Sequence, residues 1–333
     1  MKNKTLLGVL AVILSSVCYG ITPVLTNGAL DGGLPVEFLI RVFGQDYPAA
    51  LAASAETALP NESVVAFAMG FGCLISLLSL AAKRKLNTLR VDRGVFFSAS
   101  ALGGAAFFAT CLLLTYAYRY MDKGATIVLH FTYPAISCIA AALIFKERLT
   151  WLKGVAAALA IAGVYFVSNF GGATNALGPI FALLSAVTYA TYILGGRYSA
   201  YASVDSSVST VYVTGTASLL GFAAAAVLGT LELPASATVW ALLALDGLIG
   251  YLIALRLMLY GIRTLGSGTA SMLNTLEPVM ASVSGIIVFG EAFGLQKGVG
   301  YALVLGAALL TVSGSVREDR RQRRAESELA QSR

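Results

Sequence analysis

Ten apolar stretches, each about as long as a bilayer is thick, restrict this chain more than any other feature of its sequence. They span roughly 5–27, 62–82, 94–118, 124–145, 151–169, 176–197, 207–229, 237–259, 267–289 and 296–314. A helix needs about 20 apolar residues to cross the hydrocarbon core. Charged residues make up only 12% of the chain and the mean hydropathy is +0.78, whereas an ordinary globular chain is about a quarter charged. The sequence therefore predicts an integral membrane protein with little chain left for a soluble domain.

The stretches are long, unbroken and rich in Leu, Ala, Val and Gly, so they predict helices rather than the alternating strands of an outer-membrane barrel. The fold class expected is an all-α integral membrane protein with ten transmembrane helices. Lys2 and Lys4 precede the first stretch, which could belong to a signal peptide, but no small-x-small cleavage site follows. We expect a retained first helix.

The chain repeats itself at a spacing of 144 residues. "GATIVLHFTYP" at 124–134 matches "GTASMLNTLEP" at 268–278, and the register holds from Asn61 and Asp205 to the Lys-Gly pairs at 153–154 and 297–298. "LSSVCYG" at 14–20 matches "LSAVTYA" at 184–190, at an offset of 170. One register held over this length indicates an internal repeat. We therefore expect halves at 1–170 and 171–316, an additional external loop at about 28–61 with one short helix, and a charged tail at 317–333.

Each half has an odd number of predicted helices, so the second half must cross the membrane in the opposite direction to the first. Of the 23 Lys and Arg residues, four lie in loops predicted to be external and Arg256 lies within a span, which leaves 18 on the cytoplasmic side if the N-terminus is cytoplasmic. The positive-inside rule favours this orientation. We expect two inverted five-helix repeats around a central cavity, both termini in the cytoplasm and a location in the inner (plasma) membrane.

Two phrases carry a resemblance to a known family. A proline in the fourth or ninth stretch is followed by about ten apolar residues and then by "FKERLTWLKG" at 145–154 or "FGEAFGLQKG" at 289–298. This arrangement resembles the EamA domain of the drug/metabolite transporter superfamily, over residues 5–315. The resemblance implies ten helices, an inverted repeat and a cavity lined by both halves. Family members move amino acids, nucleobases, drugs and other small metabolites, commonly outward, while the long first loop departs from the compact family pattern.

Polar residues inside the spans indicate where the cavity lies, because they are costly in lipid and usually face the protein interior or water. In the ninth stretch, polar residues recur on one helical face, and the fourth stretch carries the equivalent face. His130 aligns with Asn274, and Tyr133 aligns with Glu277. The tyrosines at 19, 116, 189, 192, 212 and 251 could stack on an aromatic cargo, and packing or anchoring at the membrane interface is the alternative role for each. The candidate substrate-binding residues are His130, Tyr133, Ser137, Ser271, Asn274, Glu277, Tyr19 and Tyr189.

Two carboxylates are candidates for coupling transport to protons or cations. Glu277 lies near the middle of the ninth stretch, directly before Pro278, and Asp246 lies in the eighth. Each also has a structural interpretation, as a protonated or paired carboxylate. His130, the single histidine, could accept a proton, donate a hydrogen bond or only pack. The four cysteines have no metal-binding spacing, and we expect neither a metal nor a cofactor.

The sequence favours a secondary transporter and no enzyme. The chain has no phosphate-binding Walker loop, so we do not expect this chain alone to drive transport by ATP hydrolysis. The fourth and ninth stretches contain no Lys or Arg, which disfavours phosphorylated cargo. Hydroxyls, an amide, an imidazole, a carboxylate and aromatic rings suit a small amphipathic solute such as an amino acid or amine. The alternatives are an intramembrane enzyme and a non-transporting receptor or scaffold. The partners expected are a small-molecule substrate and the lipid bilayer, with no nucleic acid. The sequence is compatible with a homodimer.

Overall fold

The structure is a computed structural model that describes residues 2–120, 123–146, 150–167, 176–290 and 293–331. These residues form helices and connecting loops; the one β contact among them is an isolated parallel bridge between Leu34 and Ala52. The all-α class predicted from the sequence is thus confirmed. The repeat acids Glu147 and Glu291, and residues 168–169 of the fifth predicted span, lie outside the described residues.

The helices of the first half follow the predicted stretches closely. In chain order they are α1 (Lys2–Leu30), α2 (Val36–Phe43), the short 3-10 helix η1 (Ala49–Leu51), α3 (Asn61–Ala82), η2 (Leu86–Leu89), α4 (Arg93–Ser98), the π-helical segment η3 (Ala99–Ala105), α5 (Ala106–Tyr120), α6 (Lys123–His130), α7 (Tyr133–Phe145) and α8 (Trp151–Val167). The short helix expected in the 28–61 loop is α2.

The second half repeats the same order of helices. Its elements are α9 (Leu177–Tyr198), η4 (Ala200–Ser203), α10 (Ser206–Leu228), α11 (Ala237–Asp246), the π-helical segment η5 (Gly247–Ala254), α12 (Leu255–Leu265), α13 (Ser267–Leu273), η6 (Asn274–Leu276), α14 (Glu277–Phe289) and α15 (Leu295–Gln331). The third and eighth predicted helices, which are equivalent in the repeat, each contain a π-helical segment. The fourth and ninth are both interrupted.

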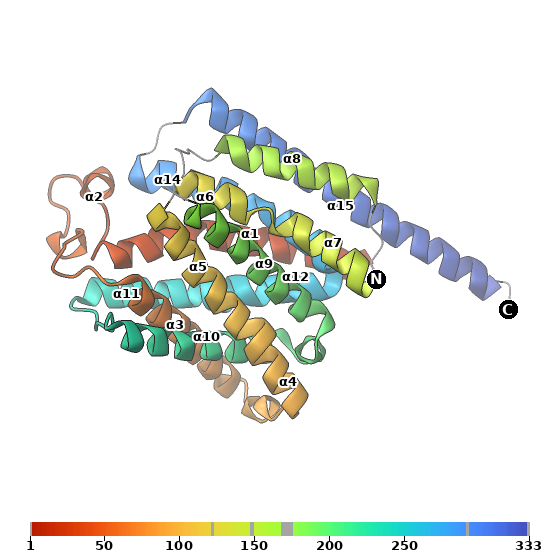
Figure 1. Ribbon diagram of the computed structural model, residues 1–333, viewed down its shortest axis with the longest axis horizontal. Helices are drawn as coiled ribbons and strands as arrows, with labels where there is room; N and C mark the ends of the chain where they lie inside the picture. Colours follow the sequence, from red (N-terminus) through yellow and green to blue (C-terminus); the bar gives the residue numbers. More distant parts are fainter. Residues whose placement is uncertain (1, 121–122, 147–149, 168–175, 291–292, 332–333) are drawn as a thin grey trace.

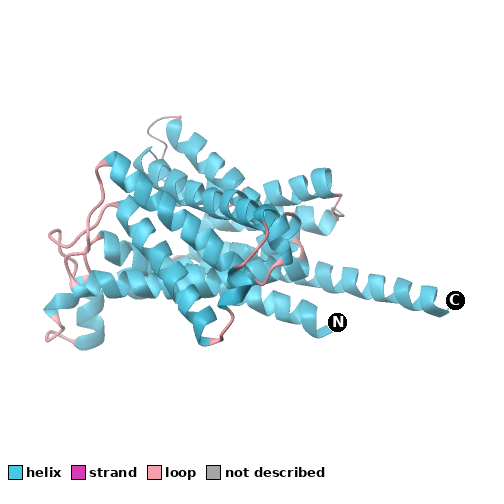
Figure 2. Cartoon of the chain, turned by 90° about the horizontal axis from the view of Figure 1, so that it is seen from below, coloured by secondary structure: helices cyan, strands magenta, loops and turns pink. Residues whose placement is uncertain are grey.

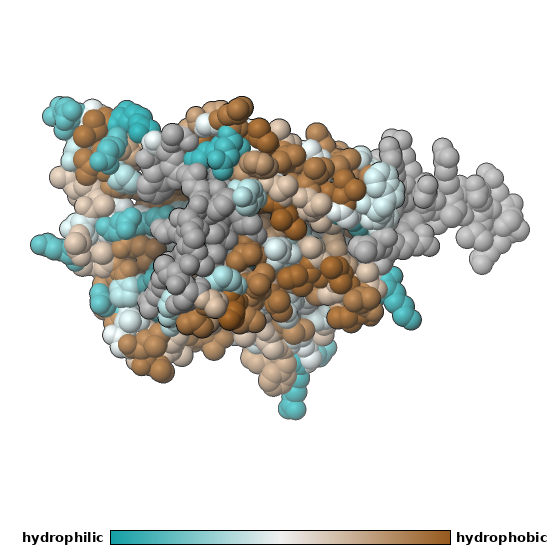
Figure 3. Space-filling view, turned by 45° about the horizontal axis from the view of Figure 1, so that its top comes forward, coloured by the Kyte–Doolittle hydropathy of each residue, from teal (hydrophilic) through white to brown (hydrophobic). Residues whose placement is uncertain are grey.

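Seven helices of the described chain are long and apolar enough to cross a membrane, and three shorter apolar helices, Tyr133–Phe145, Trp151–Phe166 and Leu295–Thr311, accompany them. Figure 3 shows hydrophobic side chains over much of the middle of the molecule and hydrophilic ones mainly toward its two ends. Large apolar side chains such as Leu143, Leu219 and Val227 are 72% to 87% exposed. Such surfaces are expected where lipid, not water, is the surrounding solvent.

The bundle mixes helices from the two halves. Helix α1 packs against α12 and α14, α5 against α9, α3 against α10, and α8 against α15. Figure 1 shows α8 and α15 side by side along one edge, with α15 extending beyond the bundle. The N- and C-termini lie at one end and the loop bearing α2 lies at the other, which Figures 1 and 2 both show.

Glycine allows a close crossing between α3 and the π-helical segment of the eighth predicted helix. A Cβ added at Gly247 would lie 2.5 Å from the Cβ of Phe71 and 2.8 Å from the carbonyl oxygen of Ala68. A Cβ at Gly72 would lie 2.5 Å from the Cβ of Tyr251. The crossing thus needs glycine on both helices and sets the depth at which Tyr251 faces the interior.

Candidate functional site

Two equivalent prolines set the positions of the helix interruptions. Pro134 and Pro278 lie in the first turn of α7 and α14, respectively. A proline removes one backbone N–H, and its ring clashes with the carbonyl four residues earlier. Those earlier residues are His130 and Asn274, which the repeat also aligns. The sequence thus ends the first half-helix just where its polar residues occur.

A cavity of about 520 Å³ lies between the two halves. Residues of α1, α3, α5, α6, α9, η5 and α14 contribute to its wall. The lining residues are Tyr19, Thr22, Pro23, Thr26, Asn27, Leu30, Asn61, Val64, Val65, Phe107, Thr110, Cys111, Leu114, Ile127, His130, Tyr189, Gly250, Tyr251 and Glu277. Asn27 and Leu30 end α1 and Asn61 begins α3, so the cavity extends toward the end of the bundle that carries the 28–61 loop.

Glu277 presents its carboxylate to this cavity from the first residue of α14. Its Oε2 accepts a hydrogen bond of 2.9 Å from Nδ2 of Asn274. The same Nδ2 donates to the hydroxyl of Tyr133 at 3.0 Å. The Ser16 hydroxyl shares its hydrogen between the Val12 carbonyl at 3.0 Å and Oδ1 of Asn274 at 3.1 Å. The fully buried Asn274 amide therefore links Ser16 of α1 and Tyr133 of α7 to Glu277 by hydrogen bonds. We call this network the floor of the cavity.

His130 ends α6 on the opposite side of the cavity. Its Nδ1 lies 2.9 Å from the Ser185 hydroxyl oxygen, and that hydroxyl donates to the Ala182 carbonyl at 2.6 Å. Because the hydroxyl has one hydrogen and gives it to Ala182, its oxygen accepts from Nδ1–H of His130. A neutral imidazole held in this way keeps its lone pair on Nε2.

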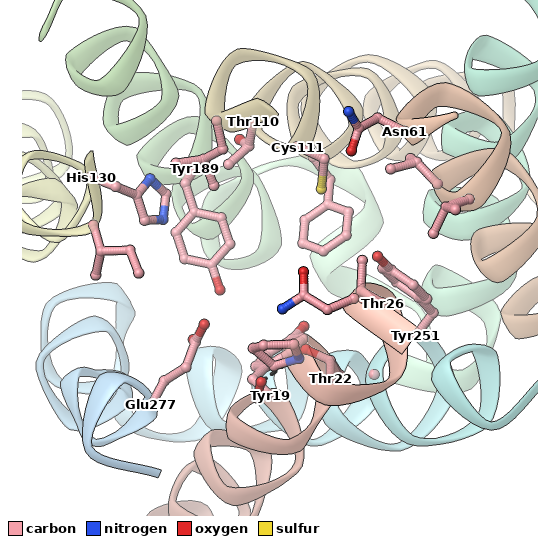
Figure 4. Close-up of a pocket in the computed structure, with 18 of the residues that line it drawn as sticks. Tyr19, Thr22, Thr26, Asn61, Thr110, Cys111, His130, Tyr189, Tyr251 and Glu277 are labelled. Carbon is pink, nitrogen blue, oxygen red and sulfur yellow. Dashed lines mark hydrogen bonds between the residues drawn. The ribbon is translucent and has the colours of Figure 1, made fainter. Parts of the chain in front are cut away.

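Aromatic rings form much of the remaining wall, and they come in repeat-related pairs. Tyr19 and Tyr189 are equivalent at the offset of 170, and Phe107 and Tyr251 are equivalent at 144. The rings of Phe107 and Tyr251 are in edge contact, with centroids 6.2 Å apart. The hydroxyl of Tyr19 is buried and has no partner among the described residues. In Figure 4, Tyr189 and Glu277 point toward the same open space.

Asp246 lies directly behind the cavity wall. It is 1% exposed, and its Oδ2 accepts a hydrogen bond of 2.9 Å from the lining residue Thr26. Within the described chain its Oδ1 has no hydrogen-bond partner. A Cβ added at Gly250, which lines the cavity, would lie 3.2 Å from that oxygen. One side chain of α1 thus separates the second buried acid from the cavity.

The described part of the cavity wall carries an acidic but no basic fixed charge. Among the lining residues that the structure describes, Glu277 is the one carboxylate, and none is Lys or Arg. The searched, described residues hold no group of three or more His, Cys, Asp or Glu that could bind a metal ion. The electrostatic character of this wall favours a cation over an anion.

The structure separates the sequence-predicted residues into three groups. Tyr19, His130, Tyr189 and Glu277 line the cavity, while Tyr133 and Asn274 lie beneath Glu277 in one hydrogen-bond network. The other two predicted residues are placed elsewhere: Ser271 bonds the Gly268 carbonyl of its own helix turn at 3.0 Å, and the buried Ser137 hydroxyl has no partner in the described chain. Neither serine is part of the lining.

Sequence reasoning also missed several lining residues. Phe107 could have been found, because it aligns in the repeat with Tyr251, which the sequence did mark as a possible stacking residue. The threonines and asparagines gave no such signal, since single hydroxyls in spans also occur as packing residues; the missed ones are Thr22, Thr26, Asn27, Asn61 and Thr110.

Comparison with known proteins decides the family. The model of the EamA-like transporter family matches residues 49–169 and again residues 176–313. This chain belongs to that family. Membership places it among the membrane transporters of the drug/metabolite transporter superfamily, as the two phrases of the sequence predicted.

Its fold is shared with solved structures. One of these solved structures is titled "Crystal structure of protein". Its similarity covers 93% of this chain and 97% of the chain in that structure, with a TM-score of 0.72 and 16% sequence identity. At this identity the likeness concerns the fold alone. No curated protein sequence matches the chain.

Proposed function

We propose that this transporter moves a small amphipathic solute with a protonated amine, such as an amine or an amino acid, by alternating access of its cavity. The observation that carries the proposal is the pairing of one carboxylate, Glu277, with aromatic rings in a cavity whose described lining residues include no Lys or Arg. An ammonium group is stabilised by a carboxylate and by the faces of aromatic rings, and both attractions strengthen away from water.

The cavity suits one small solute. A volume of about 520 Å³ lies within the ~300–1,000 Å³ usual for small-molecule sites. The ammonium would bind Glu277 between Tyr19 and Tyr189, and an apolar portion would contact Leu30 and Val64. An amino-acid carboxylate would find hydroxyl and amide donors but no cation among the described lining residues, so we expect simple amines to bind more tightly than amino acids.

We further propose ten membrane crossings in two inverted halves, with both termini cytoplasmic and outward transport. The common end of the two termini and the distribution of Lys and Arg support this orientation. In a variant whose native cysteines are replaced, an impermeant thiol reagent applied to intact cells should label Glu56→Cys and leave Gln322→Cys unlabelled. The reverse pattern would refute the orientation.

Flux through reconstituted vesicles tests the function. Purified protein should accumulate aromatic and alkyl amines against their gradient when a pH gradient is imposed, and it should move organic phosphates and dicarboxylates little. Glu277→Gln should lose both the exchange of amine across the membrane and the accumulation driven by the pH gradient, because the amide neither pairs with an ammonium nor ionises. Asp246→Asn is the matched control at the second buried acid.

The same vesicles separate the alternatives. Mass spectrometry should recover the amine unchanged, whereas a modified product would favour an intramembrane enzyme. Absence of flux for the whole panel would favour a receptor or scaffold. Accumulation retained in Glu277→Gln but lost in Asp246→Asn would assign coupling to Asp246.

A further inference from the structure

The contacts between the interrupted helices are asymmetric although their sequences are repeated. Tyr133 of the first half bonds Asn274 of the second at 3.0 Å. At the offset of 144, Tyr133 corresponds to Glu277 and Asn274 corresponds to His130. The repeat image of the observed contact is therefore a contact between Glu277 and His130.

In this structure the cavity lies between His130 and Glu277, where the repeat would place a direct contact. Both His130 and Glu277 line it, from α6 and α14. The complementary half-helices, α7 and α13, pack directly against each other beneath it. His130 is instead held by Ser185, and Glu277 is held by Asn274. The half-helices α7 and α13 are thus in direct contact, whereas α6 and α14 both face the open cavity. We call these two combinations the two diagonal pairs.

Inverted repeats exchange such arrangements when a transporter alternates, because each half takes the conformation that the other had before. We propose that the opposite-facing state of this transporter is held by direct contact between His130 and Glu277, and that cargo and His130 compete for the same carboxylate. This proposal rests on the proposed function. It assigns His130 and Glu277 to the step in which the cargo-free transporter changes from one facing state to the other.

The exchange balances one proton against one cargo cation. With cargo bound, the ammonium neutralises the Glu277 carboxylate and His130 is neutral. When the ammonium leaves, a proton from water takes its place on Nε2 of His130, and the imidazolium donates to the carboxylate. Nδ1–H can keep its bond to Ser185 throughout. Loaded and returning forms then carry the same net charge, so exchange of a monovalent amine for a proton is electroneutral.

Among the described side chains around the cavity, no other charge compensates the pair. The titratable groups that face it from neighbouring elements are phenols and a thiol: Tyr19 of α1, Tyr133 of α7, Tyr189 of α9, Tyr251 of η5 and Cys111 of α5. These groups carry no charge near neutral pH in their ordinary state. Asp246 is the one further acid beside the cavity, and Thr26 separates it from the pair.

The single histidine makes the contact directly observable. Protein purified with a histidine-free tag, labelled with [15N]His and [13C]Glu and reconstituted in bilayers, should show a dipolar contact between Nε2 of His130 and the Glu277 carboxyl carbon. Benzylamine, used as the amine probe, should weaken this contact and restore the neutral imidazole signal. The Tyr133→Phe variant, which loses the opposing contact, should strengthen it. Absence of the contact in both the wild type and Tyr133→Phe would overturn the proposal.

A native thiol reports the same equilibrium. Cys111 lines the cavity, and its thiol faces the space shown in Figure 4. With the other three cysteines replaced by alanine, Tyr133→Phe should slow alkylation of Cys111 several-fold because it favours closure of the cavity. Adding His130→Gln should restore the original alkylation rate, because it removes the charge-assisted hydrogen bond that holds the cavity closed. Equal alkylation rates in all three proteins would refute the pairing.

The two hypotheses fail separately. If vesicles move no amine but the dipolar contact and alkylation rates behave as expected, the cargo is wrong and the pairing stands. If amines are exchanged but the contact is absent and the rates are equal, the pairing is wrong and the cargo stands.

Discussion

Replacement of Asn274 by alanine should destabilise the protein far more than an ordinary buried substitution. The Asn274 side chain is fully buried and makes three hydrogen bonds, to Ser16, Tyr133 and Glu277. A net bond to a charged group contributes about 1.5–3 kcal/mol, and each neutral bond contributes about 0.5–1.5 kcal/mol. We therefore expect Asn274→Ala to lower the free energy of unfolding by about 4 kcal/mol.

Ser271→Ala provides a matched control one helical turn earlier. Ser271 is equally buried, but its hydroxyl bonds only the Gly268 carbonyl of its own helix. Its loss should cost about 0.5–1.5 kcal/mol. Asn274→Leu keeps the side-chain volume, so comparison with alanine separates the lost bonds from the empty space.

Equilibrium unfolding in mixed detergent micelles, followed by fluorescence, would measure these differences from the denaturant midpoint. The expected order of stability is wild type, then Ser271→Ala, then the two Asn274 variants close together. If Asn274→Leu is as stable as Ser271→Ala, the amide does not hold the floor of the cavity. The network that we derive beneath Glu277 would then be incorrect.

Three further predictions concern the scaffold around the site. Gly247→Ala should cost about 1–3 kcal/mol because its new Cβ overlaps α3, whereas Gly306→Ala, with nothing within 4 Å, should be neutral or slightly stabilising in the same unfolding assay. Thr26→Val should leave both oxygens of buried Asp246 without a partner and cost about 1–3 kcal/mol, most of which Thr26→Val with Asp246→Leu should recover. Arg41, which donates to a carbonyl in the last turn of α14 at 2.8 Å, should contribute about 0.3–1 kcal/mol there, measured as faster proteolysis of the 28–61 loop in Arg41→Ala.

The sequence predicted the long uninterrupted helices well. The stretch at 62–82 became Asn61–Ala82, and the stretch at 176–197 became Leu177–Tyr198. Length and hydrophobicity decide such helices, because an unpaired backbone group is too costly in lipid. Local composition did not predict the π-helical segments η3 and η5, whose extra residue per turn depends on packing against neighbouring helices.

Only some of the predicted site residues lie around the cavity. Polar residues at helical spacing selected His130 and Glu277, and both line it. The same spacing also selected Ser137 and Ser271, which are not in the lining, because α6 and α13 end before α7 and α14 begin. A face that is continuous in an unbroken helix does not stay continuous across an interruption.

Under the proposed pairing, divergence of the repeat would make the two opposite states of the cavity respond differently to cargo. If both halves carried the Tyr133 and Asn274 types, the two opposite states would make the same neutral contact, and neither would respond to cargo or protons. The second half instead has Glu277 at the position of Tyr133, and the first half has His130 at the position of Asn274. A contact between His130 and Glu277 is therefore ionisable, whereas the contact between Tyr133 and Asn274 is neutral. A ligand shifts an equilibrium only by its differential affinity for the two states. Under the proposed pairing, an ammonium acts on the ionisable diagonal alone, so chemical asymmetry between the copies is what couples cargo to the direction of the transition.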